Sequence, residues 1–340
     1  MQTKADIVRE YRTKFPDKPT KALARLVYKK KANKLLWKDE EAVRSSLRYI
    51  EGKQGEKARK EAKEKAEFFI QEARPYNPYK LPDSDETDYS PFVVHGKRIG
   101  VINDVHVPYH SISALTVAIS FLKRSKIDVL ICNGDFWDFH GLSRFIKDPR
   151  KRRFASEIQV GIQLLELLQK ELKCKIIFKP GNHDDRLLHY LWQKMGEIDE
   201  LADLEEIKEL SLESIVRKRS PNLDIEFVKS KQIIRVNDLN IVHGHEFASS
   251  IMSPVSIARG LYLRAKASSL CGHHHRTSEH TENSIESKIV TTWSVGCLCE
   301  LHPEYMPINN WNHGFALIEV NEENQTFHVV NKRIYGNTVL

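Results

Sequence analysis

Short apolar runs alternate with amphipathic stretches along most of this chain, beginning near Lys97. Residues 112–124 and 157–172 carry apolar side chains at helical spacing. Five other runs have the length of buried strands, at residues 98–102, 129–132, 175–178, 240–242 and 267–270, and the first four are rich in valine, isoleucine and leucine. Such an alternation of strands and helices predicts an α/β domain.

Two parts of the chain depart from this alternation. Residues 185–222 are helical in pattern, strongly charged and without a strand-like run, so we expect a helical insertion that caps the domain near its functional site. The chain beyond Gly272 is rich in strand-like runs. Residues 315–320 and 326–331 flank the turn-forming residues 321–324, which predicts a β-hairpin.

The first 51 residues have the pattern of three short helices. Thr20 and Asp39 are residue types that cap helices, and Val43 and Leu47 lie four residues apart on one predicted face. This outline fits a helix-turn-helix that presents Arg44 outward, and it equally fits a three-helix bundle without a role in nucleic-acid binding.

Two segments of low apolar content separate these helices from the α/β region. Residues 56–74 place glutamate and lysine four positions apart, which predicts a solvated helical connector. Residues 75–91 contain four prolines and predict an extended linker. We therefore expect a basic helical domain at residues 1–74, a linker at 75–96 and an α/β domain at 97–340.

Positive charge is concentrated at one end of this 340-residue chain, whose formal net charge is +7. Residues 1–74 contain 21 lysines and arginines against 12 aspartates and glutamates, whereas the remainder contains 32 against 34. A basic first fifth joined to a nearly neutral body favours electrostatic docking, with nucleic acid as the expected partner.

The remaining bulk properties predict a cytoplasmic protein that does not enter a membrane. No segment approaches the roughly 18 consecutive apolar residues that cross a bilayer, and the N-terminal residues lack the apolar core of a signal peptide. The chain has five cysteines, and an odd number in apolar contexts argues against a disulfide framework. We interpret Cys297 and Cys299 as thiols at a strand end rather than as a metal or redox pair.

Polar clusters directly follow the five predicted strands. In an α/β sheet, ligands collect beyond the carboxyl ends of strands, so we expect these clusters to meet. Carboxylate, amide and imidazole donors suit manganese, iron or zinc, and one carboxylate can bridge two such cations. The candidate metal ligands are Asp104, His106, Asp135, Asn182, His243, His273 and His275.

The order and form of these clusters resemble the motifs of the calcineurin-like metallophosphoesterase superfamily, which are DxH, GDxxD, GNHD or GNHE, HG and GHxH. The chain reads DVH from Asp104, GDFWD from Gly134, GNHD from Gly181, HG from His243 and GHHH from Gly272. The resemblance covers residues 97–333, and the contexts DVHVPYH and GNHDDRLLHYL are similar to a branch met in phages and prophages. It implies a four-layer α/β/β/α sandwich and a metal-dependent phosphoesterase activity.

The resemblance also implies which residues hold two divalent cations, with manganese expected and iron or zinc as alternatives. The first cation would be held by Asp104, His106, Asp135 and His275. The second would share Asp135 and add Asn182, His243 and His273. A hydroxide that bridges the cations would then attack phosphorus in line.

In the same superfamily the GNH histidine faces the substrate, so His183 is the first candidate for protonating the leaving oxygen. Asp138 matches the acid that orients this histidine, which would fix its tautomer and raise its pKa. Asp184 is the rival for the role of acid.

Several positions depart from the superfamily pattern or have open roles. Phe139 stands where serine/threonine phosphatases of the superfamily carry a phosphate-binding arginine, which disfavours a phosphoprotein substrate. His274 stands where a small hydroxyl residue is commoner. The roles of His110, His245 and Arg186 are open, because each lies near the predicted site without matching a motif. The basic loop at 147–153 fits either phosphodiester binding or a solvated approach to a helix.

These observations predict a dinuclear metal-dependent phosphoesterase that hydrolyses phosphodiesters, with nucleic acid as the favoured substrate. One alternative is a phosphomonoesterase or pyrophosphatase that acts on a small nucleotide. Another is a nucleic-acid-binding module with a vestigial metal core, against which the intact ligand set argues. Nothing in the pattern determines the oligomeric state.

Overall fold

The computed structural model describes residues 3–15, 18–30, 33–49, 89–143, 154–195, 209–247, 255–283, 289–304, 306–321 and 323–340. The chain divides into two compact units, Met1–Asp85 and Glu86–Leu340, and each is described by itself. The predicted connector at 56–74, residues 75–88 of the predicted linker and the basic loop at 147–153 lie outside the described residues.

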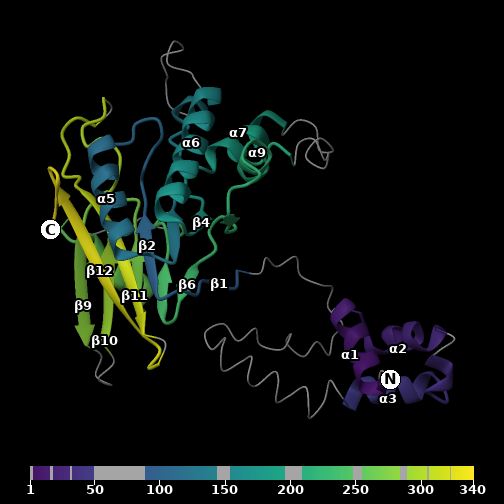
Figure 1. The fold of residues 1–340 in the computed structure, drawn as a ribbon. Helices are drawn as coiled ribbons and strands as arrows, with labels where there is room; N and C mark the ends of the chain where they lie inside the picture. Colours follow the sequence, from purple (N-terminus) through teal and green to yellow (C-terminus); the bar gives the residue numbers. More distant parts are fainter. Residues whose placement is uncertain are drawn as a thin grey trace. The chain divides into compact units, whose positions relative to one another are not determined.

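The N-terminal unit contains the helices α1 (Lys4–Lys14), α2 (Thr20–Lys29) and α3 (Glu40–Tyr49) and the short helix η1 (Asn33–Leu35) (Figure 1). Asp39 caps α3 as predicted, because its Oδ1 accepts a hydrogen bond of 2.7 Å from the amide of Ala42. The predicted cap at Thr20 is wrong, since Thr20 is the first residue of α2 and Pro19 precedes it. The helices enclose a small core of Ile7, Val8, Leu23, Ala24, Val27, Trp37, Val43 and Leu47.

Two sheets form the framework of the unit Glu86–Leu340. The seven-stranded sheet has the order β13-β12-β11-β2-β3-β4-β5, and the six-stranded sheet has the order β1-β6-β7-β8-β10-β9. The strands of the first sheet are β2 (Arg98–Ile102), β3 (Val129–Asn133), β4 (Lys175–Lys179), β5 (Ile225–Phe227), β11 (His313–Asn321), β12 (Thr326–Tyr335) and β13 (Thr338–Val339). Those of the second are β1 (Phe92–Val93), β6 (Ile234–Val236), β7 (Leu239–Ile241), β8 (Ser269–Cys271), β9 (Ser278–Asn283) and β10 (Ile289–Ser294).

The sheets pack face to face and are covered by helices on their outer faces. Ile99 of β2 and Leu270 of β8 belong to one apolar cluster between the sheets. A second cluster joins the outer face of the seven-stranded sheet to α5 (Ile112–Ser125) and α6 (Phe154–Leu172). On the other sheet, α10 (Ile257–Ala265) packs through Leu261 against Cys271. Two sheets with helices packed on them agree with the predicted mixed α/β fold.

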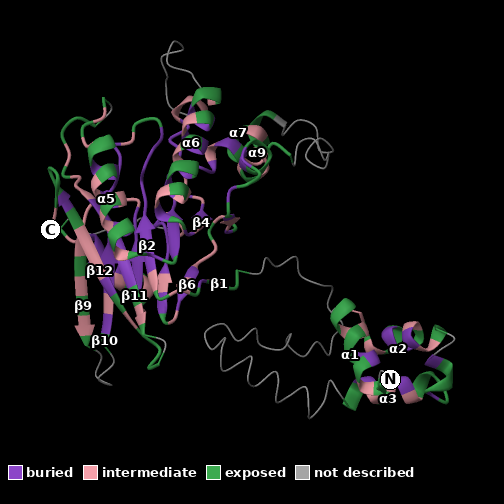
Figure 2. Ribbon diagram, in the orientation of Figure 1, coloured by how far each residue is buried: buried purple, intermediate pink, exposed green. Residues whose placement is uncertain are grey.

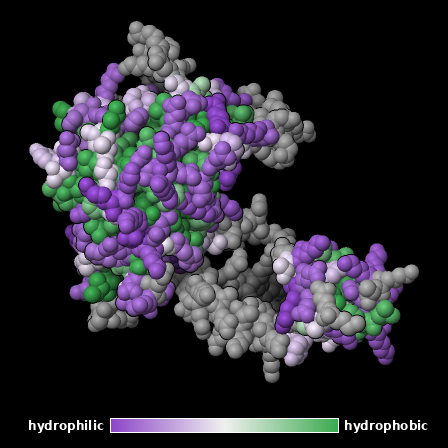
Figure 3. Space-filling view, viewed as in Figure 1, coloured by the Kyte–Doolittle hydropathy of each residue, from purple (hydrophilic) through white to green (hydrophobic). Residues whose placement is uncertain are grey.

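Burial explains why the predicted strands were recognisable in the sequence. β2 and β4 are buried from their second residue onward, so both of their faces are apolar (Figure 2). The face of the unit seen in Figure 3 is mostly hydrophilic, with apolar side chains in scattered patches. Among the described residues, no helix is long and apolar enough to cross a membrane.

Parallel pairing brings the strand ends that carry the polar clusters to one end of the framework. β2, β3 and β4 are mutually parallel neighbours, with Cys132 paired to both Ile102 and Phe178. β7 and β8 are parallel neighbours in the second sheet. The loops after β2, β3, β4, β7 and β8 therefore come from two sheets, whereas the expectation that their polar clusters meet was based on a single sheet.

The predicted helical insertion contains two described helices. α7 (Arg186–Met195) begins directly after the loop that follows β4, and α9 (Leu212–Arg219) precedes β5. Residues 196–208 lie outside the described part of the chain. The short helix η3 (His140–Leu142) follows the loop after β3 and contacts α7.

Candidate metal centre

The predicted ligands lie in short loops whose backbone is unusual. Asp104, His106, Asp135, His273 and His275 all have positive φ, between 50° and 66°. Left-handed conformations are uncommon for residues other than glycine, and they concentrate at functional sites. The loops after β2, β3 and β8 therefore turn sharply just beyond their strands and direct polar side chains to a common point.

Two glycines permit the close approach of these loops. A Cβ atom at Gly134, which has a φ of 86°, would collide with the ring of His243. A Cβ atom at Gly181 would collide with the carboxylate of Asp135. These glycines precede predicted ligands in the chain, so their lack of a side chain is part of how the ligands meet.

A first group of ligand atoms surrounds the edge of the His275 ring that carries Nε2. This atom lies 3.2 Å from Nε2 of His106 and 3.3 Å from Oδ1 of Asp104. Nε2 of His106 lies 4.0 Å from Oδ1 of Asp104 and 3.9 Å from Oδ2 of Asp135. Asp104, His106 and His275 thus converge, and Asp135 lies beside His106.

A second group lies on the other side of Asp135. Oδ2 of this residue is 3.2 Å from Nε2 of His243, and Asp135, His243 and His273 offer ligand atoms that all lie within 4.8 Å of one another. Asn182 follows Gly181 in the loop after β4. Asp135 therefore belongs to both groups.

Buried nitrogen and oxygen atoms without hydrogen-bond partners indicate that this site binds a cation. Oδ1 of Asn182 and Nδ1 of His273 are buried and accept or donate no hydrogen bond in the described structure, and Nε2 of His243 faces the carboxylate of Asp135 at 3.2 Å. An unpaired buried polar atom is costly, and a bound metal ion would satisfy Asn182 and His273. Oxygen and imidazole donors are the kinds that divalent transition metals bind, so the residues present fit such a group.

Charge at the centre leads to the same conclusion. Burial by itself would raise the pKa of Asp104, but the adjacent His275 outweighs burial and holds that pKa below its usual range. Burial likewise opposes, and Asp135 promotes, protonation of His243, whose pKa is raised to about 10. The buried carboxylates thus require neighbouring positive charge, which divalent cations would supply.

Asp138 contacts two histidines, of which the sequence analysis had predicted one. Its Oδ1 lies 3.0 Å from Nδ1 of His183 and 3.0 Å from Nδ1 of His106. A carboxylate accepts hydrogen bonds, so it favours a proton on Nδ1 of each ring. His106 is then left with a lone pair on Nε2 for a metal, and one carboxylate oxygen sets the tautomer of both rings.

Arg186, whose role was open, lies directly on His183. Its Nη1 donates a hydrogen bond of 2.7 Å to the carbonyl oxygen of Asp138, and its Nη2 lies 3.0 Å from Nε2 of His183. The side chains of Arg186 and His183 are each 17% exposed, so solvent reaches both. A guanidinium therefore stands at the edge of the centre, at the first residue of α7.

Asp184, the alternative candidate for the proton donor, is surrounded by backbone amides that it binds. Its carboxylate is buried and accepts hydrogen bonds from the amides of Gly181, Trp137 and Phe136 at 2.8, 2.9 and 3.3 Å. Burial raises its pKa to about 7. This residue fastens the loop after β3 to the loop after β4, which leaves it poorly placed to meet a substrate.

A buried ion pair behind His243 was missed by the sequence analysis. Nζ of Lys179, which is fully buried, lies 2.8 Å from Oε1 of Glu246. The Glu246 carboxylate accepts hydrogen bonds from the amides of His243 and Gly244, at 2.8 and 2.6 Å. The available signal was a lysine at the end of an otherwise apolar strand, and it became interpretable only once Glu246 was located beside it.

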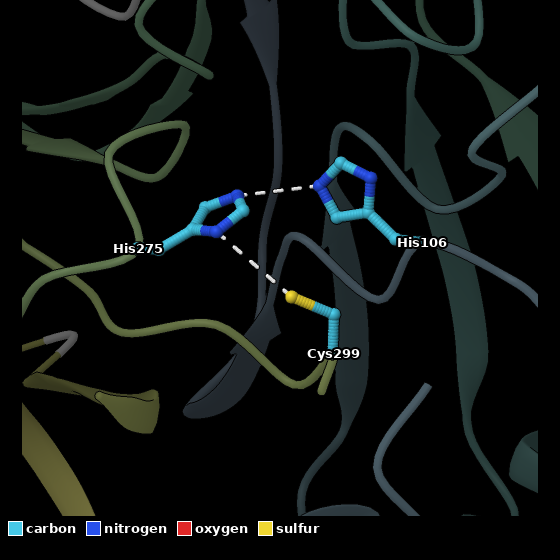
Figure 4. Close-up of side chains that lie close together, drawn as sticks. All are labelled: His106, His275 and Cys299. Atoms are coloured by element: carbon cyan, nitrogen blue, oxygen red, sulfur yellow. Dashed lines mark hydrogen bonds between the residues drawn. The ribbon is translucent and has the colours of Figure 1, made fainter. Parts of the chain in front are cut away.

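Cys299 was also missed. The interpretation of Cys297 and Cys299 as thiols without a metal role overlooked that Sγ of Cys299 lies 3.9 Å from Nδ1 of His275 (Figure 4). Cys299, His275 and His106 form a group of side chains that could hold a metal ion. The sequence offered no signal, because Cys299 lies 24 positions beyond His275 and outside every motif.

Three further histidines with open roles lie around the centre. His110 forms an isolated β-bridge with Cys299. The ring of His245 lies 5.4 Å from that of His243, and the ring of His274 lies 5.0 Å from that of His273. All three neighbour the candidate ligands without completing either group.

The chain is similar to known proteins over most of its α/β unit. A family model described as calcineurin-like phosphoesterase matches residues 97–277, a stretch that contains all nine predicted site residues. The gene 54 proteins of the Mycobacterium phages L5 and D29 are 26% and 25% identical over 238 residues, covering 66% of this chain and 89% of each phage protein.

Solved structures give weaker similarities. Vps29 of Entamoeba histolytica, in complex with zinc, covers 72% of this chain and 96% of its own, with 13% identity and a TM-score of 0.36. The Escherichia coli phosphoesterase YfcE covers 68% of this chain and 98% of its own, with 13% identity and a TM-score of 0.32.

Proposed function

Because this chain belongs to the calcineurin-like phosphoesterase family and is a metal-dependent phosphoric ester hydrolase, we propose that it hydrolyses phosphodiesters with two divalent cations. The observation that carries the proposal is the position of Asp135 between two groups of ligand atoms. A carboxylate shared in this way is how proteins hold two cations about 3.5–4 Å apart.

The two ligand groups divide the predicted residues between the cations. Asp104, His106, Asp135 and His275 would hold the first, which their mutual distances support. Asp135, Asn182, His243 and His273 would hold the second, which the unpaired buried atoms of Asn182 and His273 and the contact between Asp135 and His243 support. We propose manganese as the working metal, with iron and zinc as alternatives, because nitrogen and oxygen donors accept all three.

When bound, divalent cations supply an activated water and neutralise charge on phosphoryl oxygens. His183 is the proposed donor of a proton to the leaving oxygen, and Asp138 holds its ring through Nδ1. Burial lowers the pKa of His183, but the negative charge of Asp135 and the hydrogen bond to Asp138 outweigh it and raise that pKa above its ordinary value. A raised pKa supports the role of acid near neutral pH.

Arg186 is the proposed binding group for a phosphoryl oxygen. Phe139, at the position of the phosphate-binding arginine in related phosphatases, is fully buried and stacks on Trp137. Arg186 provides a guanidinium beside His183 instead, and its planar donors match the geometry of phosphate oxygens.

Replacement of Arg186 tests this role. Arg186→Met is expected to raise KM for bis-p-nitrophenyl phosphate by about tenfold to a hundredfold, since a hydrogen bond to a charged group contributes roughly 1.5–3 kcal/mol. The KM of Arg186→Lys should lie between those of the wild type and Arg186→Met. Lysine keeps the positive charge but loses the planar, paired donors of the guanidinium. Arg124→Met, in the exposed last turn of α5, is the matched control. An unchanged KM in Arg186→Met would remove the residue from the substrate site.

The proposed substrate class is a phosphodiester, with nucleic acid favoured. The charge excess of residues 1–74 supports it, because clustered lysine and arginine attract phosphodiester backbones without sequence preference. A small nucleotide would need no such docking unit. The complete ligand set argues against a vestigial centre.

Assays of the full chain with two kinds of substrate test the proposal. Protein stripped with EDTA and supplied with Mn²⁺ should hydrolyse bis-p-nitrophenyl phosphate faster than p-nitrophenyl phosphate, and without metal it should hydrolyse neither. Cleavage of single-stranded DNA should fall steeply between about 50 and 200 mM salt, while hydrolysis of the small diester should change little. A preference for the monoester or for pyrophosphate would favour the small-nucleotide alternative.

A further inference from the structure

On the side of its ring that faces away from the predicted ligands, His275 contacts the sulfur atom of a cysteine. Nε2 of His275 faces His106 and Asp104, whereas Nδ1 faces Sγ of Cys299 at 3.9 Å (Figure 4). Cys299 is 3% exposed, and it lies beyond the residues 97–277 that the family model matches. The contact is therefore a feature of this chain's C-terminal part.

A histidine that binds a metal through Nε2 carries its proton on Nδ1. That N–H group needs an acceptor, which orients the ring and makes it a better ligand; carboxylates and backbone carbonyls are the usual ones. The thiol of Cys299 is in hydrogen-bond contact with Nδ1 of His275. The neighbouring thiol of Cys297 lies in a hydrogen bond of 3.7 Å with the carbonyl oxygen of Asn312, and it also interacts with His275.

The backbone around Cys299 is tied to the loops that carry the ligands. The amide of Leu298 donates to the carbonyl oxygen of Asp104 at 3.1 Å, and the amide of Ser111 donates to the carbonyl oxygen of Leu298 at 2.8 Å. Nε2 of His313 donates to the carbonyl oxygen of Cys299 at 2.9 Å. The sulfur thus has a defined position relative to the metal ligands.

Packing restricts the ring of His275 further. The ring of Trp311 lies 4.1 Å from that of His275, at an interplanar angle of 65°. With the indole on one side and the sulfur at Nδ1, the imidazole has little freedom to turn away from Asp104.

We infer that Cys299 is a positioning residue, whose sulfur accepts the Nδ1–H of His275 and holds this ring in place for the first metal ion. The inference rests on the proposed dinuclear site and adds to it a residue outside the family's motifs. Sulfur is a larger and weaker acceptor than a carboxylate oxygen. The metal affinity of the first site should therefore depend on the presence of this thiol, and the affinity of the second site should not.

Metal binding to the full-length protein tests the inference without reference to activity. Metal-free protein is titrated with Mn²⁺ and with Zn²⁺ by calorimetry. Cys299→Ala should lower the affinity of one of two sites by about tenfold to a hundredfold, the usual effect of removing a partner of a ligating histidine. Cys299→Ser should restore part of the loss, because a hydroxyl still accepts a hydrogen bond. Cys174→Ala, which removes a buried thiol in a different cluster, should change neither site.

Four results decide between the explanations. The melting temperature of the metal-free protein should be nearly equal in wild type and Cys299→Ala, whereas a merely structural role would lower it without a selective loss of metal. Two unchanged affinities in Cys299→Ala would overturn the inference and leave the proposed function standing. A thiolate-to-metal charge-transfer band in the Co²⁺-loaded wild type that Cys299→Ala lacks would overturn it as well, because Cys299 would then be a ligand. Wild-type protein that binds no divalent cation would refute the proposed function and the inference together.

Discussion

Asp135→Asn is expected to lower metal-dependent hydrolysis of bis-p-nitrophenyl phosphate by at least about a thousandfold, a loss of roughly 4 kcal/mol of transition-state stabilisation. The carboxylate of Asp135 is buried, and it lies 3.2 Å from His243 and 3.9 Å from His106, so it contacts both ligand groups. An asparagine keeps the size of the side chain but supplies a single neutral oxygen. It cannot bridge two cations or balance their charge.

The matched control for this experiment is Asp224→Asn, an exposed aspartate next to β5. This variant should retain wild-type turnover. Asp135→Asn should keep its circular dichroism spectrum, since its side-chain oxygen can still accept the 2.8 Å hydrogen bond from the amide of His183. Substantial turnover in a folded Asp135→Asn protein would exclude the shared carboxylate as a necessary part of the reaction.

Lys179→Met is expected to destabilise the unit Glu86–Leu340 by about 3–5 kcal/mol. Nζ of Lys179 is the positive partner of Glu246, and it donates a further hydrogen bond of 2.8 Å to the carbonyl oxygen of Gln232. Burial raises the pKa of Glu246, but Lys179 outweighs burial and lowers it to about 2. Without the lysine, an ionised carboxylate remains buried beside the loop of His243. Urea unfolding in the presence of EDTA measures the loss without a contribution from bound metal.

The double variant Lys179→Met with Glu246→Gln separates the ion pair from simple packing. Removing both charges should leave the protein more stable than Lys179→Met alone, because no unpaired charge remains buried. Lys170→Met, at an exposed position of α6, is the control and should change stability by less than about 0.5 kcal/mol. Additive losses in the double variant would show that the two side chains stabilise the protein independently.

Much of the framework was predictable because its strands are buried on both faces. β2, β3 and β4 begin at the predicted residues 98, 129 and 175, and the predicted hairpin is present as β11 and β12. β7 and β8 begin within two residues of their predicted positions. A continuous apolar run followed at once by aspartate, asparagine or histidine is a local signal. It can therefore be recognised without knowing which strands pair with it.

The assembly of the strands was not predictable in the same way. β7 and β8 pair in one sheet and β2, β3 and β4 in another, and nothing in an apolar run states which sheet it joins. The same limit applies to side chains that meet across the fold. Asp138 contacts His106 as well as His183. Asp184, which the sequence suggested as an alternative proton donor, accepts hydrogen bonds from three backbone amides.

The sequence by itself determined the class of reaction, because the metal-binding chemistry resides in residue types at short spacing after apolar strands. The tertiary structure alone decided what surrounds those ligands, namely Arg186 on His183, the Lys179–Glu246 pair behind His243 and Cys299 against His275. The physical reason is the distance along the sequence over which each kind of interaction acts. Strand and turn signals act over a few neighbouring residues, whereas hydrogen bonds here join positions as far as 193 residues apart, and packing of the two sheets brings those positions together.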